Sequence, residues 1–184
     1  MFRFLVPLLL LWGGPVMAGG TNADAEIAEA EQVRLLEEMG RLVQRQAWSG
    51  VERYYQELIG LGVTIDAESY VQGAHAARGL GDMQACYDRL REAARTSSDR
   101  SIIDWLWAID SNYGTVKLEA EVGSTLAVEV WPIDTEQRKA VQRAITVVAE
   151  QGGFTGMLPV GDYTVNTHVL TVRAGSPVEL IADR

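Results

Sequence analysis

The apolar positions of the chain follow a helical period in its first half and an alternating period in its second half. From about residue 24 to residue 113, apolar residues recur every three or four positions, and glycine or aspartate interrupts them at intervals that suit short antiparallel helices. This spacing predicts four or five helices, the first over about Asp24 to Gln46 and the third with Asp66 as its N-cap. Their apolar stripes are Ile27 to Val43, Trp48 to Ile59, Tyr70 to Leu80, Cys86 to Ala93 and Ile102 to Ile109.

Alternation of apolar and polar residues begins after Gly114, which we interpret as the terminator of the last helix. Two alternating runs joined by the Gly123-Ser124 turn predict a pair of half-buried antiparallel strands. A single helix follows, and the C-terminal part then predicts three or four short strands. The ranges are 116–122 and 126–130 for the strand pair, 134–151 for the helix and 154–181 for the remaining strands.

Together these periods predict an α+β protein of two units. Antiparallel helical hairpins over residues 19–113 are expected to pack on a small antiparallel β-sandwich over residues 114–184, with the helix 134–151 inserted into it. Because almost no linker separates the units, they should pack rigidly. Trp105 and Trp107 are two residues apart and point about 200° apart on a helix, so Trp107 is expected to be exposed or to contact the β unit.

The first residues have the features of an export signal. Arg3 precedes an apolar stretch that ends at Trp12 and is shorter than the roughly 20 residues that span a bilayer. Ala18 ends a tripeptide of the kind that signal peptidase recognises, which predicts residues 1–18 as a signal peptide cleaved between Ala18 and Gly19. An uncleaved membrane anchor is the alternative. After cleavage we expect an exported protein, periplasmic or extracellular, that is not held in the membrane.

Charge and cysteine content narrow the classes of partner. The formal net charge of −9 opposes binding to nucleic acid or to anionic lipid through a basic patch, so protein, sugar polymer or cation are the expected partners. Cys86 is the only cysteine, so no intramolecular disulfide can form. We interpret Cys86 as a core thiol; a reactive or intermolecular thiol is the alternative.

The third and fourth predicted helices resemble the tetratricopeptide repeat. The pattern consists of Tyr70, Gly73, Ala74, Ala77, Gly81, Cys86, Leu90 and Ala93. Its small residues stand where two helices must approach closely. The resemblance implies a protein-binding groove lined by Val71, Gln72, His75 and Arg78. A solvated helix surface is the other interpretation of these positions, since the family's closing proline and its carboxylate-clamping lysines and asparagines are missing.

A second resemblance lies near the C-terminus. The run from Leu158 to Val165 has the form Leu-Pro-x-Gly-x-Tyr-x-Val and leads into a valine-rich strand. It resembles the small β-sandwich modules of the PEGA and carboxypeptidase-regulatory type. That resemblance implies a spacer or recognition module with no catalytic role.

No catalytic or metal-binding motif stands out in the sequence. The two histidines, His75 and His168, are far apart in the chain, and we find neither a Cys-x-x-Cys pair nor a nucleophile elbow. We therefore expect no cofactor and no metal, and a non-enzymatic scaffold of the cell envelope that binds protein through its helical hairpins. Tyr54, Trp107 and Trp131 are candidates for exposed binding aromatics. The alternatives are an accessory wall-modifying hydrolase, whose carboxylates meet only in the fold, and binding of a polysaccharide by β-domain aromatics such as Trp131. The oligomeric state is left open.

Overall fold

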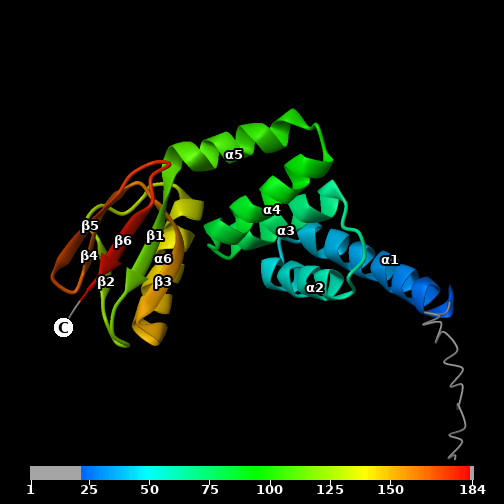
Figure 1. Cartoon of the computed structure of the whole chain (residues 1–184), viewed down its shortest axis with the longest axis horizontal. Coiled ribbons are helices and arrows are strands. Elements are labelled where there is room, and N and C mark those ends of the chain that lie inside the picture. The colour runs from blue at the N-terminus through cyan, green and yellow to red at the C-terminus, as the bar shows by residue number, and fades with distance from the viewer. Residues whose placement is uncertain (1–21, 183–184) are drawn as a thin grey trace, which may run out of the picture.

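A computed structural model of the chain describes residues 22–182, and the expected signal peptide lies outside these residues. Five helices come first and a β-rich unit follows (Figure 1). The helices are α1 (Asn22–Gln44), α2 (Trp48–Gly60), α3 (Ala67–Gly79), α4 (Met83–Thr96) and α5 (Arg100–Asn112). Within the described residues, no helix combines the length and the apolar character that crossing a bilayer requires.

Aspartate side chains fix where most of these helices begin. Asp66, Asp82 and Asp99 each accept a hydrogen bond from a backbone N–H in the first turn of α3, α4 and α5, at 2.7, 3.0 and 2.8 Å. These bonds satisfy amide groups that have no partner inside the helix. The predicted N-cap Asp66 is therefore confirmed. Asp82 and Asp99, which also interrupt the helical period, cap the helices that follow them.

The helices pack as two consecutive hairpins and a fifth helix. α1 packs on α2 and α3 packs on α4, while α3 also contacts both α1 and α2. The approach of α3 to α2 depends on Gly73, because a Cβ there would lie 2.5 Å from the ring of Tyr55. α1 is packed from Leu35 onward, whereas its residues 25–30 are largely exposed and extend beyond the hairpin (Figure 1).

The β-rich unit consists of two three-stranded sheets and one helix. One sheet has the order β3-β1-β6 and the other the order β2-β4-β5. The elements are β1 (Tyr113–Glu119), β2 (Leu126–Val128), α6 (Thr135–Gln151), β3 (Gly153–Pro159), β4 (Gly161–Val165), β5 (His168–Val172) and β6 (Val178–Ile181). The predicted α+β class, with hairpins before a small sandwich that contains one helix, is confirmed.

Two pairings differ from the expected antiparallel arrangement. The predicted pair of strands on either side of the Gly123-Ser124 turn is wrong, because β1 and β2 belong to different sheets. In addition, β6 pairs with β1 in parallel. After β5 the chain returns to the start of β1, where the Gly175 N–H donates to the Tyr113 carbonyl at 3.1 Å. β6 must then run in the same direction as β1. Gly114 permits this return, since a Cβ there would overlap the Arg173 carbonyl oxygen. The expected role of Gly114 as a helix terminator is wrong, because α5 ends at Asn112 and Gly114 lies inside β1.

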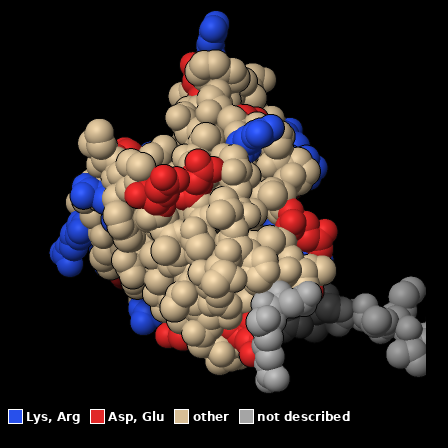
Figure 2. Space-filling model, turned by 90° about the vertical axis from the view of Figure 1, so that its left-hand side faces the viewer, with Lys and Arg blue, Asp and Glu red and all other residues tan. Residues whose placement is uncertain are grey.

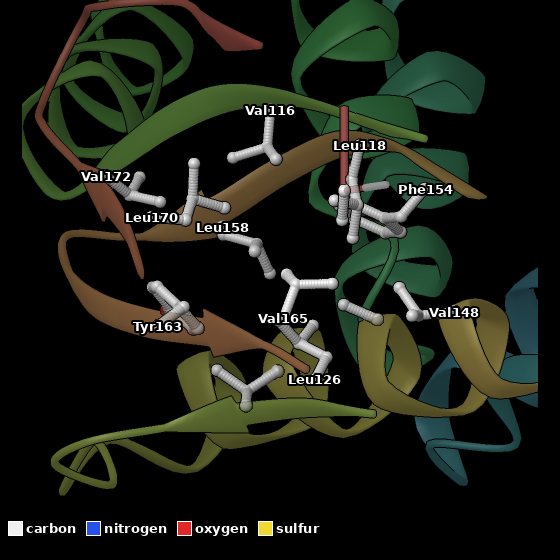
Figure 3. Packing of buried hydrophobic residues seen from close by; sticks show 13 residues of the cluster. Val116, Leu118, Leu126, Val148, Phe154, Leu158, Tyr163, Val165, Leu170 and Val172 are labelled. Atoms are coloured by element: carbon white, nitrogen blue, oxygen red, sulfur yellow. The ribbon is translucent and has the colours of Figure 1, made fainter. Parts of the chain in front are cut away.

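The core of this unit lies between the two sheets and is closed on one side by α6 (Figure 3). Its buried side chains include Val116, Leu118, Leu126, Val141, Val148, Phe154, Leu158, Tyr163, Val165, Leu170 and Val172. The chain passes from one sheet to the other at the bend between β3 and β4. The Tyr163 hydroxyl, buried in the core, fastens this bend by donating to the Pro159 carbonyl at 2.8 Å.

The helical and β units contact each other directly. Ala140 of α6 and Met157 of β3 are buried in the same cluster as α3, α4 and α5 residues. At the turn between α3 and α4, Gly81 approaches α6 so closely that a Cβ would lie 2.5 Å from the Lys139 carbonyl oxygen. Beside it, Arg143 of α6 pairs with Asp82 at 2.7 Å. The position of α6 therefore links the two units.

Candidate functional site

The exposed side of α3 carries an aromatic cluster to which three helices contribute. The ring of His75 lies between Trp48 of α2 and Trp105 of α5, with centroid distances of 6.4 and 4.7 Å. Trp48 lies directly over Gly79, where any Cβ would overlap the indole ring. All three rings are half-buried, so each keeps part of its surface available. We call Trp48, His75, Arg78 and Trp105 the aromatic groove.

Arg78 covers one part of this groove. Its guanidinium lies 4.8 Å from the centroid of the Trp105 ring, which is a cation–π distance. No described carboxylate forms an ion pair with Arg78. Next to Arg78 and Trp105, a hollow of about 400 Å³ opens between α5 and the start of α6. Its lining also includes Met83, Asn112, Tyr113, Asp134, Glu136 and Gln137.

Burial in the groove lowers the pKa of His75, and the nearby positive charge of Arg78 lowers it further. The imidazole is therefore neutral at pH 7, with one nitrogen that can donate and one that can accept a hydrogen bond. Arg78 supplies the formal positive charge of the groove. This surface combines ring faces, a neutral polar group and one cation.

The four predicted groove residues have different environments. His75 and Arg78 both belong to the aromatic groove. Val71 is half-buried and packs against the core shared by α3 and α4. Gln72 donates to Glu68 at 3.3 Å along the helix surface.

The three candidate exposed aromatics also differ. Trp107 on α5 is 72% exposed, and Trp131 in the loop between β2 and α6 is 49% exposed. Tyr54 is half-buried against the core of α1 and α2, and the Arg53 guanidinium lies 4.7 Å from its ring centroid. The sequence did not indicate Trp48 as a wall of the groove. Gly79, where a glycine stands late in a helix, was the available signal for a large side chain lying over α3.

A second concavity, of about 520 Å³, lies at the junction of the two units. It is bounded by the α3–α4 turn, α6 and the outer face of the β3-β1-β6 sheet, with a lining that includes Gln84, Lys117, Glu119, Arg143, Gln151 and Thr155. Both basic side chains have partners: Arg143 pairs with Asp82, and Lys117 donates to Glu179 at 2.6 Å and contacts Glu119 at 3.0 Å. The hydrogen bonds to Glu179 and Glu119 raise the pKa of Lys117.

The remaining candidates for reactive chemistry are the Cys86 thiol and clusters of metal-binding side chains. Cys86 is fully buried in the helical core, and burial raises the pKa of its thiol to about 12. Among residues 22–182, no three His, Cys, Asp or Glu side chains are grouped so that they could hold a metal ion.

Comparison with known proteins returned no relative: no family model matches the sequence, and neither a curated protein nor a solved structure is similar to it at a significant level.

Proposed function

We propose that this protein is exported to the periplasm and acts there as a non-enzymatic scaffold that holds a protein partner in the aromatic groove. The observation that carries this proposal is the cluster of Trp48, His75, Arg78 and Trp105 on the helical hairpins. Tryptophan and arginine are enriched among the residues that dominate binding energy at protein interfaces. Because packing already holds these rings, the groove loses little side-chain entropy when a partner binds.

The expected ligand is a protein segment that places an apolar or aromatic side chain against the Trp105 face. An acceptor group of that segment would then reach Arg78, which has no carboxylate partner within the described residues. The tetratricopeptide-like pattern of α3 and α4 supports the same surface, since it implies a groove along that side of α3.

The test is affinity capture from envelope extract with the mature chain, residues 19–184. Lys117 and Lys139 are the only lysines, so a carboxylate-reactive crosslinker is preferable to amine chemistry. Arg78→Ala removes the groove cation, and Arg91→Ala removes an exposed arginine of α4 as the matched control. A stoichiometric protein retained by wild type and by Arg91→Ala but lost by Arg78→Ala supports the proposal. Equal retention by both variants contradicts it.

Export is tested separately with the full-length chain. Mass spectrometry of the periplasmic fraction should find a protein that begins at Gly19, as the signal-peptide prediction requires. A chain that keeps residues 1–18 and sediments with membranes would instead identify the uncleaved anchor.

The junction concavity supports a second candidate function, binding of a wall polysaccharide or assistance in its hydrolysis. Its lining of amide, hydroxyl and paired charged groups suits a ligand rich in hydroxyls. Retention of the protein on purified wall, lost in Gln84→Ala and kept in Arg78→Ala, would favour this candidate over the scaffold. Release of soluble sugar fragments would indicate in addition that the protein assists hydrolysis of the wall.

A further inference from the structure

A second apolar surface lies far along the chain from the aromatic groove, in the loop between β2 and α6. Ile133 is 96% exposed, Val130 78%, and Trp131 about half. Val160, at the bend between β3 and β4, adds an exposed apolar side chain next to them. We call Val130, Trp131, Ile133 and Val160 the loop patch. Single exposed apolar residues are common on protein surfaces, but a contiguous group of large ones marks a binding site.

Hydrogen bonds hold the loop patch in place at both ends. The Glu129 N–H donates to the Asp162 carbonyl at 3.0 Å, which continues the β2–β4 pairing into the loop. At the other end Asp134 caps α6 by accepting from the Gln137 N–H at 2.9 Å. The Val160 N–H donates to the carbonyl of Asn112 at the end of α5 at 3.0 Å. The apolar side chains are therefore displayed by an anchored backbone, which reduces the entropy cost of binding.

The hollow beside these side chains has a defined charge. It measures about 370 Å³ and is lined by the loop patch together with Glu129, Pro132, Gln137, Gly161 and Asp162. Two of these residues are acidic, and no lysine or arginine is among them. The Thr171 hydroxyl donates to the Asp162 carboxylate at 2.6 Å, which fixes that carboxylate at the rim. An apolar hollow with a purely acidic rim is complementary to an apolar side chain flanked by basic residues.

We propose that the loop patch binds a protein segment in which a large apolar side chain is flanked by lysine or arginine. The apolar side chain enters the hollow beside Trp131 and Val160, and the basic side chains pair with Glu129 and Asp162. This site does not depend on the aromatic groove. A chain with both surfaces can hold two different partners at once.

The acidic rim also distinguishes this partner from two other occupants. A second copy of the chain on a two-fold axis would place the same patch against itself, so Glu129 and Asp162 of both copies would repel each other. An anionic lipid surface would repel the same carboxylates. The wider surface at the β-rich end is largely uncharged, with acidic and basic side chains in small separate groups (Figure 2).

The test uses NMR of the mature chain labelled at its tryptophan indoles. The probes are two amidated synthetic peptides, one with leucines flanked by arginines and the other with glutamates in place of the arginines. The arginine peptide should shift the Trp131 indole signal and leave those of Trp48 and Trp105 unchanged. Ile133→Ser and Glu129→Lys should each weaken binding about tenfold, and added salt should weaken it further. Ile133 is almost fully exposed, so its replacement should leave folding intact.

Matched controls separate the patch from general effects of charge and apolar surface. Ile103→Ser removes another exposed isoleucine, on α5, and Glu26→Lys makes the same charge change on α1. Both should bind the arginine peptide like wild type. Equal binding of the glutamate peptide, or unchanged binding by Ile133→Ser, overturns the proposal. If wild type self-associates and Ile133→Ser does not, the occupant of the loop patch is a second copy of the chain. If the protein binds phosphatidylcholine vesicles in a way that depends on Ile133, the occupant is lipid. If the protein binds no peptide but is retained on purified wall, and Trp131→Ala abolishes that retention, the occupant is a polysaccharide.

Discussion

Replacement of Gly81 by alanine tests how much the contact between the two units contributes to stability. Gly81 has a φ of +77°, in the left-handed region that costs an L-residue about 1–2 kcal/mol. The added Cβ would also lie 2.5 Å from the Lys139 carbonyl oxygen of α6. Backbone cannot move aside as a flexible side chain can, so the α3–α4 turn must shift away from α6. Such overpacking typically costs a further ~1–3 kcal/mol.

Gly62 provides the matched control. It occupies the turn after α2 with a φ of +66°, and a Cβ there would have no neighbour within 4 Å. Gly62→Ala should therefore show only the conformational cost, reduced by the about 0.4–1 kcal/mol that alanine gains through the unfolded state. We expect Gly62→Ala to cost about 1 kcal/mol and Gly81→Ala about 2–4 kcal/mol. Asparagine tolerates the left-handed region better, so Gly62→Asn should be close to wild type while Gly81→Asn stays destabilised.

Urea unfolding, followed by both circular dichroism and tryptophan fluorescence, measures these differences. The expected loss for Gly81→Ala corresponds to a fall in Tm of about 2–4 °C per kcal/mol for a chain of this size. If Gly81→Ala and Gly62→Ala lose the same free energy of unfolding to within about 0.5 kcal/mol, the contact between the turn and α6 contributes nothing.

Three further predictions concern buried groups of the helical unit. Arg89 pairs with Glu52 at 2.6 Å, and only 11% of the Arg89 side chain is exposed. Arg89→Met should therefore lower the free energy of unfolding by about 2–3 kcal/mol. A double-mutant cycle with Glu52→Gln should show coupling between the two residues, and additive losses would contradict this. Burial alone would raise the pKa of Glu52, but the hydrogen bonds from Arg89 and Gln56 and the charge of Arg89 lower this pKa overall. The contribution of Glu52 to stability is therefore present above the unfolded pKa of about 4.3 and is lost as the pH falls below that value. Glu52→Gln should therefore flatten the acid side of the stability profile, and an unchanged profile would refute that sign. Cys86 should not react with a disulfide reagent at pH 8 until the protein unfolds, because burial keeps its thiol protonated and covered; rapid reaction of the native protein would contradict this.

Local signals in the sequence located most elements, and the failures occur where a long-range contact decides. Capping aspartates such as Asp66 made the helix starts readable, and α6 was expected within a residue of its observed start. The second strand was expected to reach Val130, but it ends at Val128 because the chain turns outward into the loop patch. The parallel pairing of β6 has no local signal, since it depends on the return of the chain past Gly114.

In the candidate site, too, local sequence signals indicated some residues, and long-range contacts decided the others. The repeat-like pattern of one helix pair selected Val71, Gln72, His75 and Arg78 together, but only His75 and Arg78 belong to the aromatic groove. Trp48 and Trp105 reach this side from α2 and α5, and their meeting on either side of His75 is a tertiary contact that no spacing encodes.

The parallel pairing of β6 has a consequence for how the protein is made. β1 is the middle strand of its sheet, yet the partner on one of its edges, Val178–Ile181, is made after all the other strands of the β-rich unit. A ribosome-bound or prematurely ended chain therefore presents an open edge on β1, the kind of edge that recruits other chains. The β-rich unit can close only after β6 has been made, so chains that end before β6 should be prone to pair with other chains through β1.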